Sequence, residues 1–202
     1  MFPQPLMTLL LVRHGQTQAN VEGRFYGRTD SPMTEEGHKQ VQATAERLKD
    51  WPVSHVYSSP AMRAKHTAEI LNQQWQKPLT LDERLWEMDH NRWELLTPTE
   101  IQATYPMDWE KFLSGDTSAA HHGGETYQQV ADRSRALIDD IKGQHSCTGE
   151  TIALAAHGGT LGIMMCELLG TANRGWWPYR FKNAGVAEIV LYEFGGVLTG
   201  FQ

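Results

Sequence analysis

Two histidines follow short apolar segments in the same way at opposite ends of the chain. His14 comes directly after residues 9–13 and His157 directly after residues 151–156, and a glycine follows each histidine. Histidine is one of the side chains that accept a transferred group covalently, and the guanidinium group of Arg13 is suited to binding phosphate oxygens. We therefore predict that His14 is a nucleophile that accepts a phosphoryl group.

Both apolar segments are too short for a helix and are typical of buried strands. Ligands of open α/β sheets bind at the carboxyl ends of the strands. If the two strands are neighbours, His14 and His157 therefore point into one cleft. A single histidine at such a position is more often structural, but two equivalent histidines beside an arginine favour a functional site.

A third strand end adds a second arginine. Residues 53–58 read as a strand, and Arg63 lies in the first turn of the helix that we predict over residues 61–75. The free N–H groups at a helix N-terminus attract anions, and arginine adds a permanently charged fork. Most single arginines are solvated surface residues, so it is this position that marks Arg63 as a candidate for phosphate binding.

Strands alternate with helices along the chain, which predicts an α/β fold with a mostly parallel central sheet and helices on both faces, a three-layer sandwich. The predicted strands cover about residues 7–12, 53–58, 79–81 and 151–156, with a closing hairpin of 186–192 and 197–201 around Gly195-Gly196. The predicted helices cover about residues 35–50 after Thr34 as N-cap, 61–75, 99–113, 125–141 and 160–169.

The composition is that of an ordinary globular protein of 202 residues, with 40% hydrophobic residues and a net charge of −6. We predict a single domain over residues 1–202, with an insertion at about 82–124 that covers the site and contains a mobile loop at 114–124. The acidic balance argues against nucleic-acid binding but leaves a small anionic ligand possible.

The two cysteines, Cys147 and Cys166, lack the spacing of metal ligands and indicate free thiols in a cytoplasmic protein. The N-terminus has the features of neither a signal peptide nor a membrane span. No metal and no other cofactor is expected. The adjacent His121 and His122 lie in a Gly-rich segment and do not have the geometry of metal ligands.

A series of motifs occurs in an order that is typical of one family and spans nearly the whole chain. The ordered set resembles the histidine phosphatase superfamily, the phosphoglycerate-mutase-like proteins. The resemblance implies a metal-independent phosphomonoester hydrolase that forms a phosphohistidine. The motifs are residues 11–17 (Leu-Val-Arg-His-Gly-Gln-Thr) with Asn20, 30–37 (Asp-Ser-Pro-Met-Thr-Glu-Glu-Gly), Ser58-Ser59 with Arg63 and Thr67-Ala68, 82–88 (Asp-Glu-Arg-Leu-Trp-Glu-Met), 124–126 (Gly-Glu-Thr) and 156–159 (Ala-His-Gly-Gly).

The resemblance also implies a role for each matched residue. His14 would be the nucleophile, and Glu87 would give a proton to the leaving oxygen and later activate water, with Glu83 and Glu94 as less favoured alternatives. His14 must be neutral for this role, whereas a protonated His157 would be a cationic donor. The residues that would hold the phosphoryl group or the rest of the substrate are Arg13, Asn20, Tyr26, Gly27, Arg63, His157 and Gly158.

The chain departs from the family pattern after the predicted acid. Residues 89–95 replace both glycines of an aromatic-Gly-x-Trp-Glu-Gly segment, which alters the shape expected for the substrate mouth. Tryptophans near possible lid regions along the chain would suit a substrate with an apolar or ring portion, although we expect core packing for at least half of them. They are Trp86, Trp93, Trp109, Trp176 and Trp177.

Three functions remain open. A phosphoglycerate mutase needs extra cations beside the pocket, and the segment 95–124 holds only Lys111 besides two histidines, so hydrolysis is favoured. A non-catalytic protein that binds a phosphorylated ligand is less favoured, because His14, Arg63 and Glu87 are all present. A small phosphomonoester is the expected partner in each case. The sequence selects neither a particular substrate nor an oligomeric state.

Overall fold

The computed structural model describes residues 3–115, 120, 123–145, 149–171 and 178–202. Within them, six strands form one sheet in the order β3-β2-β4-β1-β5-β6. The first four in this order run parallel, and β5 and β6 are antiparallel to their neighbours, which confirms the mostly parallel α/β fold. The strands are β1 (Met7–Arg13), β2 (Val53–Ser58), β3 (Leu79–Leu81), β4 (Glu150–Ala156), β5 (Val186–Tyr192) and β6 (Gly195–Phe201).

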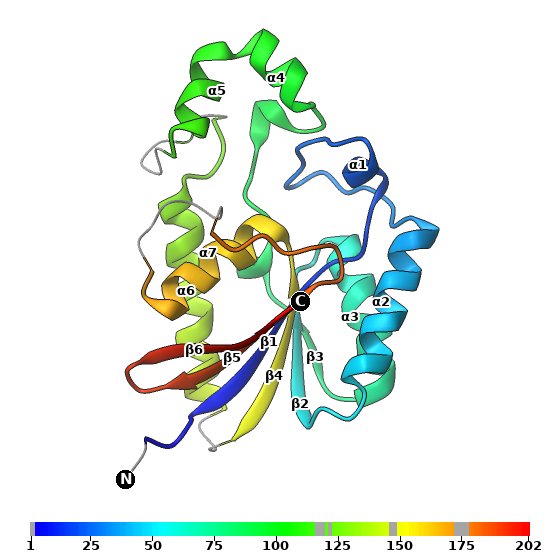
Figure 1. Ribbon diagram of the computed structural model, residues 1–202, viewed down its shortest axis with the longest axis vertical. Coiled ribbons are helices and arrows are strands. Elements are labelled where there is room, and N and C mark those ends of the chain that lie inside the picture. The colour runs from blue at the N-terminus through cyan, green and yellow to red at the C-terminus, as the bar shows by residue number, and fades with distance from the viewer. Residues whose placement is uncertain (1–2, 116–119, 121–122, 146–148, 172–177) are drawn as a thin grey trace.

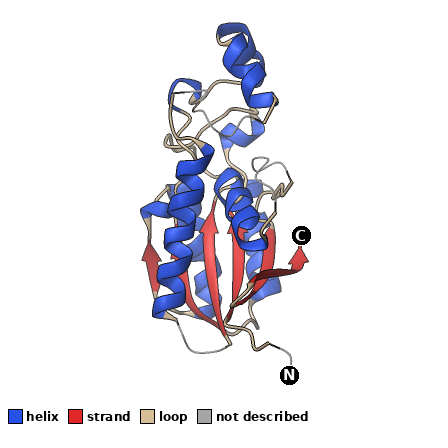
Figure 2. Cartoon of the chain, turned by 90° about the vertical axis from the view of Figure 1, so that its left-hand side faces the viewer, coloured by secondary structure: helices blue, strands red, loops and turns tan. Residues whose placement is uncertain are grey.

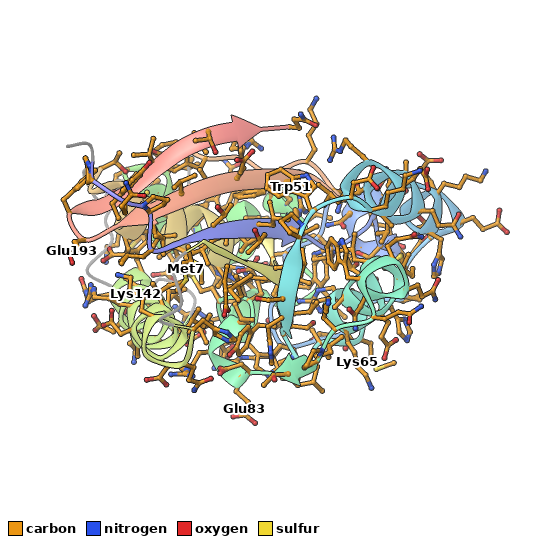
Figure 3. All side chains as sticks on the ribbon, turned by 90° about the horizontal axis from the view of Figure 1, so that it is seen from below. Met7, Trp51, Lys65, Glu83, Lys142 and Glu193 are labelled. Carbon is orange, nitrogen blue, oxygen red and sulfur yellow. The ribbon has the colours of Figure 1, made fainter. Side chains whose placement is uncertain are left out.

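Alternate residues of β1 face two separate cores, as the period of a strand requires. Leu9 and Leu11 pack with helices α6 (Tyr127–Gln144) and α7 (Gly158–Leu169). Leu10 and Val12 pack on the opposite face with α2 (Glu35–Leu48) and α3 (Met62–Trp75). Figure 1 shows the two pairs of helices on opposite sides of the sheet. In Figure 3, seen from below, Lys142 on α6 and Lys65 on α3 label these two sides.

The principal helices begin and end where local side chains satisfy the backbone. Thr34 caps α2 by accepting a hydrogen bond from the Gly37 N–H, and Thr126 forms a capping box with Gln129 at the start of α6. The helix α7 ends at Gly170, whose φ of 60° is left-handed. The predicted Thr34 cap and the predicted stop at Gly170 are confirmed.

The pairing of the central strands brings the two motif histidines together. Arg13 at the end of β1 pairs with Ala156 at the end of β4, so the residues that follow, His14 and His157, leave the sheet side by side. On the other side of β4, Ser58 at the end of β2 pairs with Ala155. Three neighbouring strands therefore end at the same edge of the sheet, as predicted.

Two predicted elements are wrong. Residues 99–113 form not one helix but two, α4 (Pro98–Thr104) and α5 (Pro106–Leu113). Pro106 has no N–H to donate and disfavours the helical conformation of the residue before it, so the first helix ends. The closing hairpin turns at residues 193–194 rather than at the two glycines, because the pairing of β5 with β6 extends to Tyr192 and Gly195. The unpredicted elements are the short α1 (Gln18–Val21) and the 3₁₀ turns η1 (Glu83–Leu85) and η2 (Asn91–Trp93).

Helices α4 and α5 lie beyond the carboxyl ends of the parallel strands (Figures 1 and 2). An aromatic cluster connects α5 to the rest of the fold. The ring centre of the fully buried Trp93 lies 5.9 Å from that of Phe25, 5.9 Å from that of Trp109 and 5.5 Å from that of Phe112. Of the tryptophans named from the sequence, Trp93 is fully buried, Trp109 is half-buried within this cluster and Trp86 is half-buried elsewhere. Trp176 and Trp177 lie outside the described residues, so core packing of at least half of the five stays a prediction.

We expect Trp93→Ala to lower the free energy of unfolding by about 3–5 kcal/mol, because the change removes a fully buried ring and leaves a cavity among the aromatic side chains. Urea unfolding followed by circular dichroism measures the loss. Trp93→Phe, which keeps an aromatic ring at the same place, serves as the matched variant and should lose less. Equal stability of Trp93→Ala and the unchanged protein would contradict the role of this ring.

Asn91 and Leu95 occupy the two positions at which the aromatic-Gly-x-Trp-Glu-Gly segment of the family has glycine, and both have a left-handed backbone conformation. The φ angle is 40° at Asn91 and 61° at Leu95. Asparagine adopts this conformation with little strain, whereas an ordinary side chain pays roughly 1–2 kcal/mol. Leu95 is 41% exposed, so its side chain gains little from packing in return.

We expect Leu95→Gly to raise the free energy of unfolding by about 1 kcal/mol, because glycine removes the strain of the left-handed backbone. Thermal and urea unfolding should agree on the sign. Asn91→Gly is the comparison variant, and it should gain less because asparagine tolerates the conformation. A loss of stability in Leu95→Gly would show that the leucine side chain contributes more than its backbone costs.

Candidate active site

A cavity of about 250 Å³ opens at the carboxyl ends of the central strands. Its wall includes five of the predicted site residues, and Phe25, Arg24, His90, Arg180 and Phe181 are among the others that line it. Three further predicted residues are buried next to this wall, with exposed fractions of 3% for His14, 1% for Arg63 and 0% for His157. The five predicted residues in the wall are Arg13, Asn20, Tyr26, Glu87 and Gly158.

The hydrogen bond of His14 determines which of its nitrogens is reactive. Nδ1 lies 2.7 Å from the carbonyl oxygen of Gly15, and a carbonyl oxygen only accepts, so Nδ1 carries the hydrogen. Burial, followed by the charges of Arg13 and Arg63, lowers the pKa of His14 well below its usual 6.5. The ring is therefore neutral at pH 7, and Nε2 keeps the lone pair that a nucleophile needs.

His157 is held through both of its ring nitrogens. Nδ1 accepts a hydrogen bond of 3.2 Å from Nε of Arg63, and Nε2 lies 2.9 Å from Oγ of Ser59. Burial, followed by the Arg63 charge, lowers the pKa of His157 well below 6.5. The ring is therefore neutral, so the condition under which His157 would be a cationic donor, its protonation, is not met in this arrangement. The His157 ring centre lies 5.3 Å from that of His14.

Arg63 is fixed by four of its five N–H hydrogens. Nη1 donates to the carbonyl oxygen of Thr29 and to the carboxylate of Asp30, both at 3.0 Å, and Nη2 donates to the carbonyl oxygen of Gly27 at 2.7 Å. Nε binds His157 as described above, and the guanidinium carbon lies 4.5 Å from the centre of the Tyr26 ring. Among the described residues, one Nη2 hydrogen is left for a ligand.

Asn20 lines the cavity, and other groups of the protein occupy its amide oxygen. Its Oδ1 accepts hydrogen bonds from the N–H of Thr17 at 3.1 Å and from Nδ2 of Asn183 at 2.9 Å. Because the oxygen is occupied, the NH₂ group is the part of the side chain that is left to donate to an anion. Sequence reasoning did not find Asn183, which is 163 residues away from Asn20 and belongs to no recognisable motif.

Glu87 lies against the start of α7. Its carboxylate accepts hydrogen bonds of 2.9 Å from the N–H groups of Gly159 and Thr160, and one of 3.0 Å from the Thr160 hydroxyl. The free N–H groups at a helix N-terminus are natural partners for a carboxylate. A Cβ on Gly159 would lie 2.8 Å from Oε1 of Glu87, so only glycine permits this approach. The close approach of the Glu87 carboxylate thus explains why residue 159, the second after His157, is a glycine.

The two alternative acids have other positions. Glu83 is exposed and does not line the cavity. Glu94 accepts hydrogen bonds from the N–H groups of residues 27–29 and does not line the cavity either. Gly27 also differs from its predicted position, since it lies between Arg63 and Glu94 and not in the cavity wall.

Positive charge dominates the site. Arg13, Arg24 and Arg180 line the cavity, whereas Glu87 is its one carboxylate among the described residues. Arg24 is paired with Glu22 at 2.6 Å. Burial lowers the pKa of Arg13, Tyr26 and Glu87 act in the opposite direction, and the charges of Arg63 and Arg180 add to the lowering, although Arg13 stays a cation. Such a site attracts anions.

In the described part of the chain, no group of three or more His, Cys, Asp or Glu side chains is placed to hold a metal ion. His121, His122 and Cys147 lie outside it, and Cys166 is buried and not part of a disulfide. No helix among the described residues is long and apolar enough to cross a membrane.

We expect the two buried histidines to make stability depend on pH. Below pH 6.5 the unfolded chain takes up protons at His14 and His157 that the folded protein does not, because their pKa values in the folded protein are lowered. The free energy of unfolding should therefore fall as the pH falls below 6.5, by up to about 1.4 kcal/mol per pH unit for each histidine. Urea unfolding between pH 7.5 and 5.5 measures this slope.

His14→Ala should remove one histidine's share of the slope. The exposed His38 provides the control, since His38→Ala should leave the slope as it is. A slope unchanged in His14→Ala would mean that His14 takes up its proton equally in the folded and unfolded states.

The comparison with known proteins identifies relatives of this site and fold. A family model described as the histidine phosphatase superfamily (branch 1) matches residues 9–202. Phosphoserine phosphatase 1 of Hydrogenobacter thermophilus is 26% identical over 193 residues, which are 96% of this chain and 90% of that protein. The probable phosphoglycerate mutase GpmB of Salmonella choleraesuis is 30% identical over 203 residues, with 97% and 90% covered.

Among solved structures, the mycobacterial glucosyl-3-phosphoglycerate phosphatase complexed with VO3 superimposes with a TM-score of 0.87. It is 29% identical, and the match covers 96% of this chain and 97% of that one. The similarity therefore extends over the sheet, both helical layers and the segment that carries Glu87.

Proposed function

Because the chain belongs to the histidine phosphatase superfamily, branch 1, we propose that it hydrolyses small phosphomonoesters through a phosphohistidine on His14. The observation that carries the proposal is the neutral imidazole of His14, whose Nδ1 donates to Gly15 and whose Nε2 is therefore the nucleophile. Related proteins named as phosphatases of phosphoserine and of glucosyl-3-phosphoglycerate support hydrolysis.

In the first step, the Nε2 lone pair of His14 attacks phosphorus and the bond from phosphorus to the ester oxygen breaks. Glu87 gives its proton to that oxygen, so the alcohol leaves neutral. In the second step, the ionised Glu87 takes a proton from water while the water oxygen attacks phosphorus. The N–P bond breaks, which restores His14 and releases inorganic phosphate.

The remaining site residues bind the phosphoryl oxygens. Phosphoryl transfer gives the protein little covalent work, so positioning and neutralisation of charge supply most of the catalysis. We assign this task to Arg13, Arg63 and the NH₂ group of Asn20, while the neutral His157 holds Arg63 in place. Tyr26 packs against Arg63 and bounds the cavity, and Gly158 forms part of its wall.

A small anionic metabolite is the substrate class that fits best. The cavity volume of about 250 Å³ suits a small molecule. Arg180 adds positive charge to the wall beyond the phosphate-binding residues, whereas the charge of Arg24 is balanced by Glu22 and Glu100. Phosphoserine and the phosphoglycerates, which carry a carboxylate in addition to the phosphate, are the compounds to test first. We also propose a cytoplasmic location, for which the low cysteine content is the supporting feature: the chain has two cysteines, and Cys166 is buried outside any disulfide.

The test is the release of inorganic phosphate from a panel of phosphoserine, phosphoglycerates, sugar phosphates, nucleoside monophosphates and an aryl phosphate. We expect at least one metabolite to be hydrolysed with kcat/KM of about 10⁴ M⁻¹s⁻¹ or higher. Conversion between phosphoglycerate isomers that depends on a bisphosphate primer would favour the mutase alternative. Phosphate binding without any turnover would favour the non-catalytic alternative.

Glu87→Gln separates proton donation from the other steps. The variant should lose about 10²- to 10⁴-fold in kcat on an alkyl phosphate, whose alkoxide leaves poorly without a proton. The loss should be much smaller for phosphorylation of the enzyme by an aryl phosphate, whose phenolate leaves readily. Equal losses in the rate of enzyme phosphorylation by the alkyl and the aryl substrate would remove Glu87 as the proton donor, whereas a loss in the hydrolysis of the phosphohistidine is common to both substrates.

A further inference from the structure

The loop of residues 27–29 lies between an arginine and a carboxylate. On one side, the carbonyl oxygens of Gly27 and Thr29 accept hydrogen bonds from Nη2 and Nη1 of Arg63, at 2.7 and 3.0 Å. On the other side, the N–H groups of the same loop donate to Glu94: Gly27 at 2.8 Å and Arg28 at 3.1 Å to Oε1, and Thr29 at 3.0 Å to Oε2.

We propose that Glu94 is a positioning residue for phosphoryl transfer, which acts through this loop on the guanidinium group of Arg63. The inference rests on the proposed function, because it concerns the arginine that binds the phosphoryl group there. Glu94 itself touches no reacting atom.

The hydrogen-bonding capacity of each group explains the arrangement. An ionised carboxylate only accepts, so both oxygens of Glu94 are available to the three N–H groups of the loop. Burial raises the pKa of Glu94, but the hydrogen bonds from Thr29, Gly27 and Arg28 outweigh burial and hold that pKa below its usual range. An amide at this position would present an NH₂ group to backbone N–H donors and would lose at least one of these contacts.

The loop also packs tightly on the segment that carries the predicted acid. A Cβ on Gly27 would lie 1.9 Å from the carbonyl oxygen of Met88, the residue after Glu87. Glu94 further accepts a hydrogen bond of 3.3 Å from the N–H of His90. One carboxylate therefore fixes the loop that holds Arg63 and contacts the segment that begins with the acid.

The orientation of the Arg63 guanidinium group depends on the position of its backbone acceptors, because four of its five N–H hydrogens bind the protein. With Gly27 and Thr29 in place, the remaining Nη2 hydrogen has one direction in which to meet a phosphoryl oxygen. A loop released by loss of Glu94 would let the guanidinium group take several orientations, and each one that misses the phosphoryl group weakens binding.

The test compares Glu94→Gln with Glu110→Gln, the matched control. Glu110 is an exposed glutamate of α5, whereas the N–H groups of residues 27–29 donate to Glu94. We expect Glu94→Gln to weaken the binding of inorganic phosphate, measured by calorimetry, about tenfold or more and to lower kcat/KM by a similar factor. Glu110→Gln should change both by less than about twofold.

A double-mutant cycle with Arg63→Lys decides whether Glu94 acts through the arginine. In the Arg63→Lys background, Glu94→Gln should weaken phosphate binding by less than about twofold further. The same tenfold loss in both backgrounds would overturn the proposal, as would unchanged phosphate binding in Glu94→Gln. If Glu94→Gln does not fold, Glu94→Asp enters the same cycle with the same expectation.

The outcome of this cycle is separable from that of the proposed function. Absence of turnover by the unchanged protein on every phosphomonoester would overturn hydrolysis. Additive losses in phosphate binding, together with normal turnover by the unchanged protein, would overturn only the role of Glu94.

Discussion

Replacement of His14 by alanine is expected to lower kcat on every substrate by at least about 10⁴-fold, because the reaction then has no group to accept the phosphoryl group. Phosphate binding should persist in this variant, since Arg13, Arg63 and Asn20 remain. Rapid quenching with a radioactive phosphomonoester provides the second measurement. The unchanged protein should carry a phosphoryl label that is stable in base and lost in acid, and His14→Ala should carry none.

His38→Ala is the control for this experiment, because His38 is an exposed histidine on α2. It should keep both turnover and labelling. Undiminished turnover by His14→Ala would show that another residue, or water directly, attacks phosphorus. A label that persists in His14→Ala would locate the phosphoryl group elsewhere.

Arg63→Ala is expected to have the second-largest effect, a fall of about 10³- to 10⁴-fold in kcat/KM, as for other arginines that stabilise a transferring phosphoryl group. The change should also lower the free energy of unfolding by about 3–5 kcal/mol. It removes the partner of Asp30 and leaves the carbonyl oxygens of Gly27 and Thr29 without their donors. Steady-state kinetics and urea unfolding measure the two effects.

Arg63→Lys distinguishes charge from geometry. Lysine keeps the positive charge, but its three hydrogens on one nitrogen cannot reproduce the contacts of the guanidinium fork. We expect it to recover part of the stability and little of the activity. Arg135→Ala, which removes an exposed arginine paired with Glu167, should change neither. Full activity in Arg63→Lys would mean that charge alone matters at this position.

The positions of the nucleophile and of Arg63 could be predicted from the sequence because their determinants are local. A short buried strand followed by a polar residue and glycine marks each strand end, and Arg63 follows its strand by only a few residues. The parallel pairing of β1 with β4 then places His14 beside His157. The sequence therefore predicts a residue's position in the fold where a few adjacent residues determine the backbone conformation.

The supporting contacts could not be predicted, because they join segments that are far apart in the chain. Asn183 meets Asn20 across 163 residues, and Glu87 meets the start of α7 across 72 residues. The neutral state of His157 depends on burial and on the direction of the Arg63 Nε–H, neither of which a sequence pattern contains. Glu87 was found through family resemblance, since its own surroundings in the sequence suggest an exposed carboxylate.

The aromatic cluster around Trp93 has a consequence for recombination between members of the family. Helix α5 attaches through ring contacts of Trp109 and Phe112 with Phe25 and Trp93, whereas residues 87–94 contact both the start of α7 and the loop of residues 27–29. The segment that can be exchanged between relatives without loss of these contacts therefore begins after Leu95, and not at the start of the predicted insertion. A graft that begins earlier would also replace the carboxylates of Glu87 and Glu94, which hold the start of α7 and the loop of residues 27–29.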